Sequence, residues 1–187
     1  MKNVIKVFFA LMLIFTQMSC SFASNGKKAC FDEAVNEIKL LDSESYSKVL
    51  GENVKFFKHD NIVYTQHYNS LGDEMLTIIS SPKNKFYATK FQIRKLDKKF
   101  LMKRNVMKNI NRFNTEKGIS LGMTPMMVFK ILGDQYDEEV MEDGITIYRY
   151  SKKNIGKDKF GNDNKSYEYK SEYHFYKSKL IEFVFGF

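Results

Sequence analysis

Residues 113–133, FNTEKGISLGMTPMMVFKILG, contain the pattern that decides the predicted fold. Thr124 is placed to cap a short helix, and Pro125 suits its first position because no backbone N–H donor is needed there. Gly133 is placed to end the helix, since glycine readily adopts the left-handed backbone found after helices. The stretch therefore predicts a turn, a capped helix and a glycine stop.

A looser copy of this stretch lies earlier in the chain, at residues 38–51, IKLLDSESYSKVLG. Its closing Leu-Gly pair ends at Gly51, which lies 82 residues before Gly133. An internal similarity at one fixed offset is typical of a duplicated structural unit. The chain is therefore predicted to contain two related units.

The residues before Gly51 predict a pair of helices. Apolar residues recur at spacings of three and four along residues 29–41, which is the periodicity of an amphipathic helix. Asp42 or Ser43 is placed to cap a second, shorter helix that Gly51 ends. The first unit is thus predicted to begin with a helix–turn–helix.

Alternating apolar and polar residues predict antiparallel strands after each helical segment. Turn-forming residues separate the segments, and the short connections favour a meander. The predicted strands are residues 54–58, 62–68, 75–80, 86–94, 145–150, 167–176 and 180–187. The acidic run 134–143 is interpreted as a solvated loop and a candidate contact for a basic protein. The predicted fold class is α+β, with two tandem repeats of a helix–turn–helix packed on an antiparallel β-meander.

The N-terminus has the features of a secretory signal peptide. Two lysines, Lys2 and Lys6, precede the apolar run 7–15, VFFALMLIF, and small residues precede a cleavage site after Ala23. The apolar run is too short for a membrane-spanning helix, which needs about 20 residues. An alternative interpretation is a bacterial lipoprotein signal, in which a lipidated Cys20 would tether the chain to a membrane.

Cleavage after Ala23 would leave 164 residues and lower the formal net charge from +8 to +6, because two lysines are removed. Cys30 would then be the single remaining cysteine, so no internal disulfide framework is expected. The chain has 17 Phe, 11 Tyr and 10 Met, which predicts a core stabilised by packing. The basic balance suits anionic lipid, cell-wall polymer or an acidic protein surface, or is simply a solvated surface.

Four segments are predicted along the chain: a signal peptide at 1–23, a first repeat at 24–95, a basic connector at 96–112 and a second repeat at 113–187. The connector reads LDKKFLMKRNVMKNINR. It is interpreted either as a link whose lysines lie in water or as a basic amphipathic helix on anionic lipid.

A longer pattern runs through the second repeat: Gly-Ile-x-Leu-Gly-Met-Thr-x-x-x-Val-x-x-x-Leu-Gly, then Tyr-x-Tyr, then Leu-Ile-x-Phe-x-Phe. With this pattern the chain resembles the β-lactamase-inhibitor-protein-like (BLIP-like) superfamily, which includes the small outer-membrane assembly lipoproteins of the SmpA/OmlA type. The resemblance implies a helix–turn–helix packed on an antiparallel sheet, a unit that occurs twice in the inhibitor itself. The matching positions are Gly118, Ile119, Leu121, Gly122, Met123, Thr124, Val128, Leu132, Gly133, Tyr148, Tyr150, Leu180, Ile181, Phe183 and Phe185.

No catalytic, metal-binding or cofactor-binding site is predicted. The three histidines, His59, His67 and His174, match no zinc-ligand spacing. Cys30 lacks a sequence context for a nucleophile, and no serine lies in a Gly-x-Ser-x-Gly turn.

Tyrosines on the predicted strands are the candidate protein-binding residues. Tyr148 and Tyr150 share one face of residues 145–150, and Tyr169 and Tyr173 share one face of residues 167–176. Tyrosine offers a large contact area at low entropic cost, which suits a binding surface. The alternative is that these tyrosines pack the core with their hydroxyls at the rim.

The expected function is that of an exported, non-enzymatic protein-binding module, an inhibitor or immunity-type factor that acts through its sheet. Its expected partner is another protein, either an envelope or a toxin protein, in the periplasm or outside the cell, and not a nucleic acid. The alternative function is a lipid-anchored envelope assembly or maintenance factor, an outer-membrane lipoprotein held through Cys20. Contact with a membrane is expected only in that second case.

Overall fold

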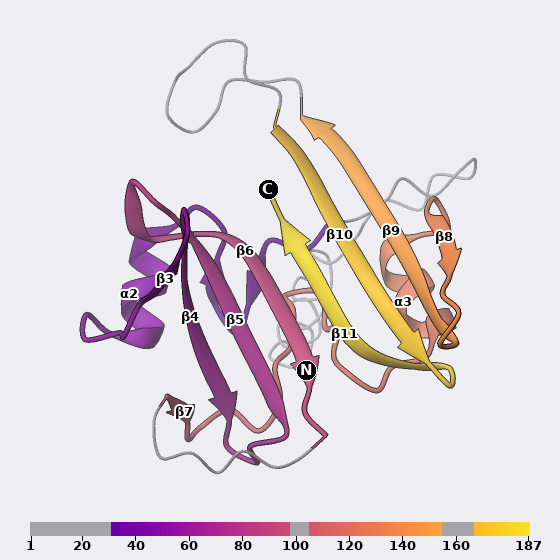
Figure 1. The fold of residues 1–187 in the computed structure, drawn as a ribbon, viewed down its shortest axis with the longest axis horizontal. Coiled ribbons are helices and arrows are strands. Elements are labelled where there is room, and N and C mark those ends of the chain that lie inside the picture. Colours follow the sequence, from indigo (N-terminus) through magenta and orange to yellow (C-terminus); the bar gives the residue numbers. More distant parts are fainter. Residues whose placement is uncertain (1–30, 98–104, 155–166) are drawn as a thin grey trace, which may run out of the picture.

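A computed structural model describes residues 31–97, 105–154 and 167–187 (Figure 1). Cys20, Cys30, the predicted signal peptide and part of the predicted connector lie outside these residues. The described elements, in chain order, are β1 (Ala34–Val35), β2 (Ile38–Lys39), α2 (Ser43–Leu50), β3 (Phe57–His59), β4 (Ile62–Asn69), β5 (Glu74–Ser81), β6 (Asn84–Lys95), β7 (Val106–Met107), α3 (Pro125–Leu132), β8 (Asp137–Val140), β9 (Ile145–Asn154), β10 (Tyr167–Tyr176) and β11 (Lys179–Gly186).

One nine-stranded sheet dominates the structure (Figure 1). Its main path runs β3-β4-β5-β6-β11-β10-β9-β8, and β7 pairs in parallel with β4. All other pairs in this sheet are antiparallel. Each half follows the same order, a helix and then four strands, and the last strands of the two halves, β6 and β11, pair at the centre.

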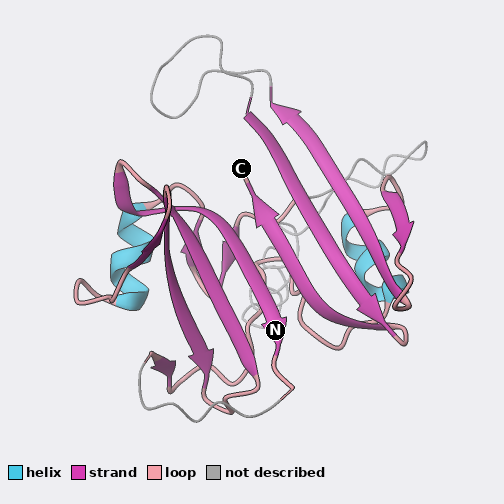
Figure 2. Cartoon of the chain, in the orientation of Figure 1, coloured by secondary structure: helices cyan, strands magenta, loops and turns pink. Residues whose placement is uncertain are grey.

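The predicted fold class is wrong, because the protein is mostly antiparallel β-sheet (Figure 2). The two helices that the structure describes have eight residues each, and no helix–turn–helix is formed in the described residues. Residues 34–39, predicted to be helical, form the β1–β2 hairpin, whose turn residues Asn36 and Glu37 have φ of 44° and 72°. A tertiary partner stabilises this turn: the Asn36 N–H donates to the Asn114 carbonyl oxygen at 3.0 Å.

The two short helices form where the caps predict them. Asp42 caps α2, and its Oδ1 accepts the N–H groups of Glu44 and Ser45 at 3.0 and 3.2 Å. Thr124 occupies the cap position of α3, with Pro125 as the first helical residue. Because α2 spans 43–50 and α3 spans 125–132, each end of α3 lies 82 residues after the corresponding end of α2.

The six long strands β4, β5, β6, β9, β10 and β11 lie close to their predicted positions, and β3 begins three residues later than predicted. β7 and β8 were not predicted as strands. β8 forms inside the acidic run that was interpreted as a loop, and all four of its side chains are exposed. It pairs with β9 at the edge of the sheet. Few apolar residues mark it, so its strand conformation depends on the neighbouring strand.

The hydrophobic core lies on one face of the sheet, beneath both helices. Tyr46 of α2 packs against Phe56 and Phe86, and Phe129 of α3 packs against Tyr148. Along the centre of the sheet, directly paired residues such as Phe91 and Phe185 carry the core from one half into the other. The core is therefore continuous across the β6–β11 pair.

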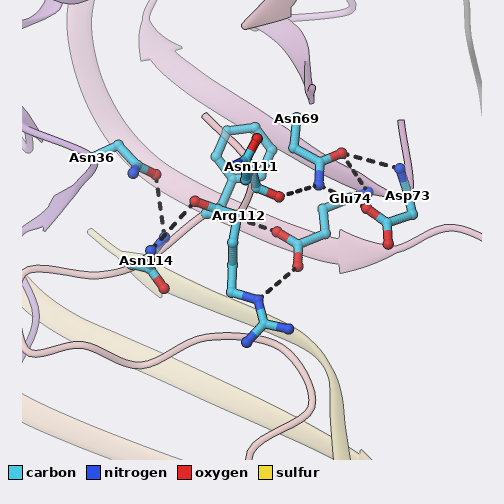
Figure 3. A network of polar contacts seen from close by, with 8 residues as sticks. Asn36, Asn69, Asp73, Glu74, Asn111, Arg112 and Asn114 are labelled. Carbon is cyan, nitrogen blue, oxygen red and sulfur yellow. Dashed lines mark hydrogen bonds and ion pairs between the residues drawn. The ribbon is translucent and has the colours of Figure 1, made fainter. Parts of the chain in front are cut away.

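A polar network holds the described end of the connector against the first half (Figure 3). The buried Glu74 accepts the backbone N–H of Phe113 at 2.8 Å through Oε2, and its Oε1 lies 3.6 Å from Arg112 Nε. Asn69 Oδ1 accepts the N–H of Glu74 at 3.0 Å, and Asn69 Nδ2 donates to the Asn111 carbonyl at 2.8 Å. The chain that links the halves is thus fixed to the β4–β5 turn.

Candidate functional site

The four candidate tyrosines lie on the core face of the sheet. The exposed fractions of Tyr148, Tyr150, Tyr169 and Tyr173 are 9%, 2%, 3% and 0%. Tyr150 lies edge-on to Tyr173, and Tyr169 donates its hydroxyl to the Asp32 carbonyl at 2.7 Å. Burial raises the pKa of all four phenols, so their hydroxyls stay protonated. They pack the core, and their sequence neighbours lie on the opposite face of the sheet.

The opposite side of the sheet, which we call the open face, carries the alternate residues of each strand. Because Arg149 lies between Tyr148 and Tyr150, its side chain points to the open face. Glu172 pairs with Arg149 across β9 and β10, and directly paired residues share a face. Both helices lie on the other side of the sheet (Figure 2).

A charged ladder crosses the second half of the open face. Arg149 Nη1 lies 2.5 Å from Glu139 Oε2, and Arg149 Nε donates to Glu172 Oε1 at 3.3 Å. Glu172 Oε2 lies 3.4 Å from His174 Nε2. The bond to Glu139 and the nearby Glu172 raise the pKa of Arg149. The three strands β8, β9 and β10 thus present one connected set of charges.

The ladder continues onto the central strands. Glu182 of β11 pairs with His174 on one side and with Arg94 of β6 on the other. Its Oε1 also accepts a hydrogen bond from Gln92 Nε2 at 2.5 Å. Polar groups therefore reach from the β8 edge to the middle of the sheet.

The first half of the open face is aromatic and aliphatic. Phe57 of β3 stacks on Tyr64 of β4 with 5.5 Å between ring centroids, and Lys55 Nζ lies 5.3 Å from the Phe57 centroid. Tyr64 pairs with Ile79 of β5, which places Ile79 on the same face. Ile62, half exposed, extends this aromatic zone toward the edge. Phe57 and Tyr64 are partly buried, and they share the open face with the arginine and acidic groups of the ladder. Aromatic residues and arginine are enriched in protein interfaces.

The sequence pattern selected the tyrosines and did not identify Phe57, Tyr64, Arg149 or Glu139 as surface residues. The period-two alternation of the predicted strands contained this information for three of them. Glu139 was missed because β8 was interpreted as a loop. Choosing between the two faces required the position of the helices.

The described residues contain no group of three or more His, Cys, Asp or Glu side chains that could hold a metal ion. His59 and Asp60 are both exposed, with 3.8 Å between Nε2 and Oδ2. His67 is buried, and burial lowers its pKa to about 4, so its ring is neutral. Among the described segments, no helix has the length and apolar character needed to cross a membrane.

Searches against protein-family models, curated proteins and solved structures returned no match for this chain.

Proposed function

We propose that this chain is an exported, non-enzymatic protein that binds another protein through the open face of its sheet, in the periplasm or outside the cell. One feature supports this proposal above all. The core and both described helices occupy one face, while the aromatic zone and the charged ladder occupy the other. Tyrosine and arginine are the residue types that contribute most to protein-binding energy.

The size of the open face suits such a partner. The main path of the sheet has eight strands. With about 4.8 Å between strands and about 3.3 Å per residue, they span roughly 35 Å by 20 Å. This area is close to the roughly 800 Å² that one partner contributes to a standard protein interface.

The two zones would contribute differently to binding. Phe57 and Tyr64 offer apolar area that is lost from water on binding, which stabilises a complex. Arg149 is already held by Glu139 and Glu172, so it is pre-oriented for a partner's carboxylate or carbonyl groups. The acidic groups of the ladder favour a partner with complementary basic residues.

Site-specific photo-crosslinking tests this proposal. A photoreactive residue replaces Gln92, at the centre of the open face, or Lys130, exposed on α3 on the other side of the sheet. Envelope and extracellular fractions of the source cell are then irradiated with each protein. We expect one stoichiometric product from position 92, no such product from position 130, and its loss when Tyr64→Ala and Arg149→Ala are added. A product from position 130 alone, or one that survives both substitutions, would contradict the open-face assignment.

A second candidate function, a lipid-anchored envelope assembly factor, is favoured by the sequence around Cys20. Mass spectrometry of the mature N-terminus distinguishes the two. A chain that begins at Ser24 supports the free binding protein, and one that begins at an acylated Cys20 supports the anchored factor.

A further inference from the structure

A cavity of about 450 Å³ lies on the core side of the first half. It is therefore separate from the open face. It lies between the last turn of α2, the strand β4 and the segment 105–110. Six of its eleven lining residues are apolar: Val49, Leu50, Val54, Val106, Met107 and Ile110. The other five are polar, namely Asn53, Asn105, Lys108, Asn109 and His67, which supplies the imidazole ring on β4.

In the second half, the side chain of Tyr150 occupies the position that corresponds to this cavity. His67 is the sixth residue of β4, and Tyr150 is the sixth residue of β9. Both side chains lie on the core face. Tyr150 reaches the end of α3, where its hydroxyl donates to the Gly133 carbonyl at 3.1 Å. The shorter side chain of His67 leaves the cavity between β4 and the end of α2.

The neighbouring position shows the same difference in size. The fourth residue is Thr65 in β4 and Tyr148 in β9. Tyr148 packs edge-on against Phe129 of α3, with 4.8 Å between ring centroids. Thr65 is much smaller, and its Oγ1 makes a hydrogen-bond contact with His67 Nε2. The first half therefore lacks rings at these two strand positions, and the rings beneath α2 come from Tyr46, Phe56 and Phe86 instead.

The chemistry of the walls defines the kind of occupant. The imidazole of His67 is neutral, and the apolar residues of the lining favour contact with an aromatic ring, while Asn53, Lys108 and Asn109 add polar groups. An apolar cavity of roughly 150 Å³ already holds a benzene ring, and pockets for small molecules begin near 300 Å³. The volume here thus leaves room for a molecule of two fused rings.

We propose that this cavity is a binding site for a small uncharged phenol-type molecule, whose ring takes the place that Tyr150 takes in the second half. The apolar walls from α2 and from residues 106 and 110 would enclose the rings. The polar residues of the lining, Asn53, Lys108 and Asn109 together with His67 and Asn105, would supply the hydrogen-bond partner for a single hydroxyl.

Titration with 2-naphthol, followed by its fluorescence and by calorimetry, tests this proposal on the complete chain. The wild-type protein is expected to bind one equivalent saturably. His67→Tyr places a phenol in the cavity from within, as in the second half, and is expected to weaken 2-naphthol binding at least tenfold. His59→Tyr adds the same ring at an exposed position on β3 and is expected to leave the affinity unchanged.

Val49→Phe fills the cavity from the α2 side and is expected to weaken binding as well, which keeps the test decisive if His67→Tyr does not fold. Circular dichroism verifies that each variant retains its sheet. The proposal is overturned if wild type shows no saturable binding up to about 1 mM. It is also overturned if folded His67→Tyr or Val49→Phe binds as tightly as wild type, or if His59→Tyr loses binding to the same extent.

Discussion

The hydroxyl of Tyr150 donates a hydrogen bond to the backbone oxygen of Gly133, with 3.1 Å between the two atoms. Gly133 ends α3 and Tyr150 lies in the middle of β9, so one side chain connects the helix end to the sheet. The end of a helix leaves carbonyl groups without helical partners, and this bond satisfies one of them. Burial raises the pKa of the phenol, which keeps the donor proton in place.

Tyr150→Phe is expected to lower the free energy of unfolding by about 1 kcal/mol, because the ring is kept and the buried carbonyl loses its donor. Urea denaturation measures the change. Tyr148→Phe is the matched control: the Tyr148 hydroxyl lies 3.4 Å from Glu138 at the rim, so a smaller loss is expected. Equal losses in the two variants would contradict the role given to the Gly133 bond.

The raised pKa of the Asp32 carboxyl group predicts a specific dependence of the unfolding free energy on pH. Burial raises its pKa from 3.8 to about 6, against the opposing effects of the Thr115 side chain and of the Lys117 N–H, which donates at 3.0 Å. As pH rises through this range, the unfolded chain releases the Asp32 proton while the folded chain retains it. The contribution of Asp32 to folding therefore becomes less favourable with rising pH.

Asp32→Asn removes this effect and keeps an oxygen to accept the Lys117 N–H. Relative to this variant, wild type is expected to lose up to about 3 kcal/mol of unfolding free energy between about pH 4 and about pH 7. Urea denaturation at both pH values measures the difference. Asp60→Asn, at an exposed site, controls for a change of one charge. An Asp32→Asn difference that stays constant with pH would rule out the raised pKa.

Substitutions of Glu74 test whether its bond to the Phe113 N–H fixes the connector between the two halves. Glu74→Leu leaves the buried Phe113 N–H without its acceptor, and the expected cost is about 1–3 kcal/mol. Glu74→Gln keeps an acceptor oxygen and is expected to cost less. Hydrogen exchange at Phe113 provides a local measurement, since its amide should be protected in the wild-type and Gln proteins and exchange faster in the Leu protein. Similar exchange in all three proteins would show that this bond does not fix the connector.

At Gly186 the backbone of β11 lies close against the backbone of β6. A Cβ atom at this position would lie 2.6 Å from the Lys90 Cα and closer still to the Thr89 backbone oxygen. The φ of Gly186, +144°, is also one that alanine rarely adopts. Gly186→Ala is therefore expected to shift the β6–β11 pair and lower the melting temperature substantially. Gly144→Ala is the control, because its φ of +80° is also strained for alanine but no atom lies within 4 Å of the added methyl. A larger effect at Gly144 would contradict the tight contact.

Local patterns predicted individual elements well where the responsible contacts are local. Asp42 with Gly51, and Thr124 with Gly133, bracket the two helices because caps act within a single turn. The strands of the first half followed from alternation, since one face of each is buried. These signals do not depend on how the elements meet in space.

Comparing the halves strand by strand needed the structure. At the 82-residue offset, Tyr87 of β6 falls on Tyr169 of β10, but β6 is the fourth strand after its helix and β10 is the third. The order of the strands, rather than the offset, identifies equivalent residues such as His67 and Tyr150. For this reason the cavity beside His67 could not be predicted from the sequence.

The sequence by itself determined the two capped helices and most of the strands, because caps, turns and alternation act over a few residues. Only the tertiary structure decided the hairpin at residues 34–39, where apolar spacing fits a helix but Asn114 holds the turn. It also decided that β8 is a strand and that both halves share one sheet through β6 and β11. Most importantly, the position of the helices determined which face became the core. Tyr148 and Tyr150 are buried on that face, and Arg149, which lies between them in sequence, is on the open face. Alternation distinguishes two faces of a strand, but only packing against another element determines which one is buried.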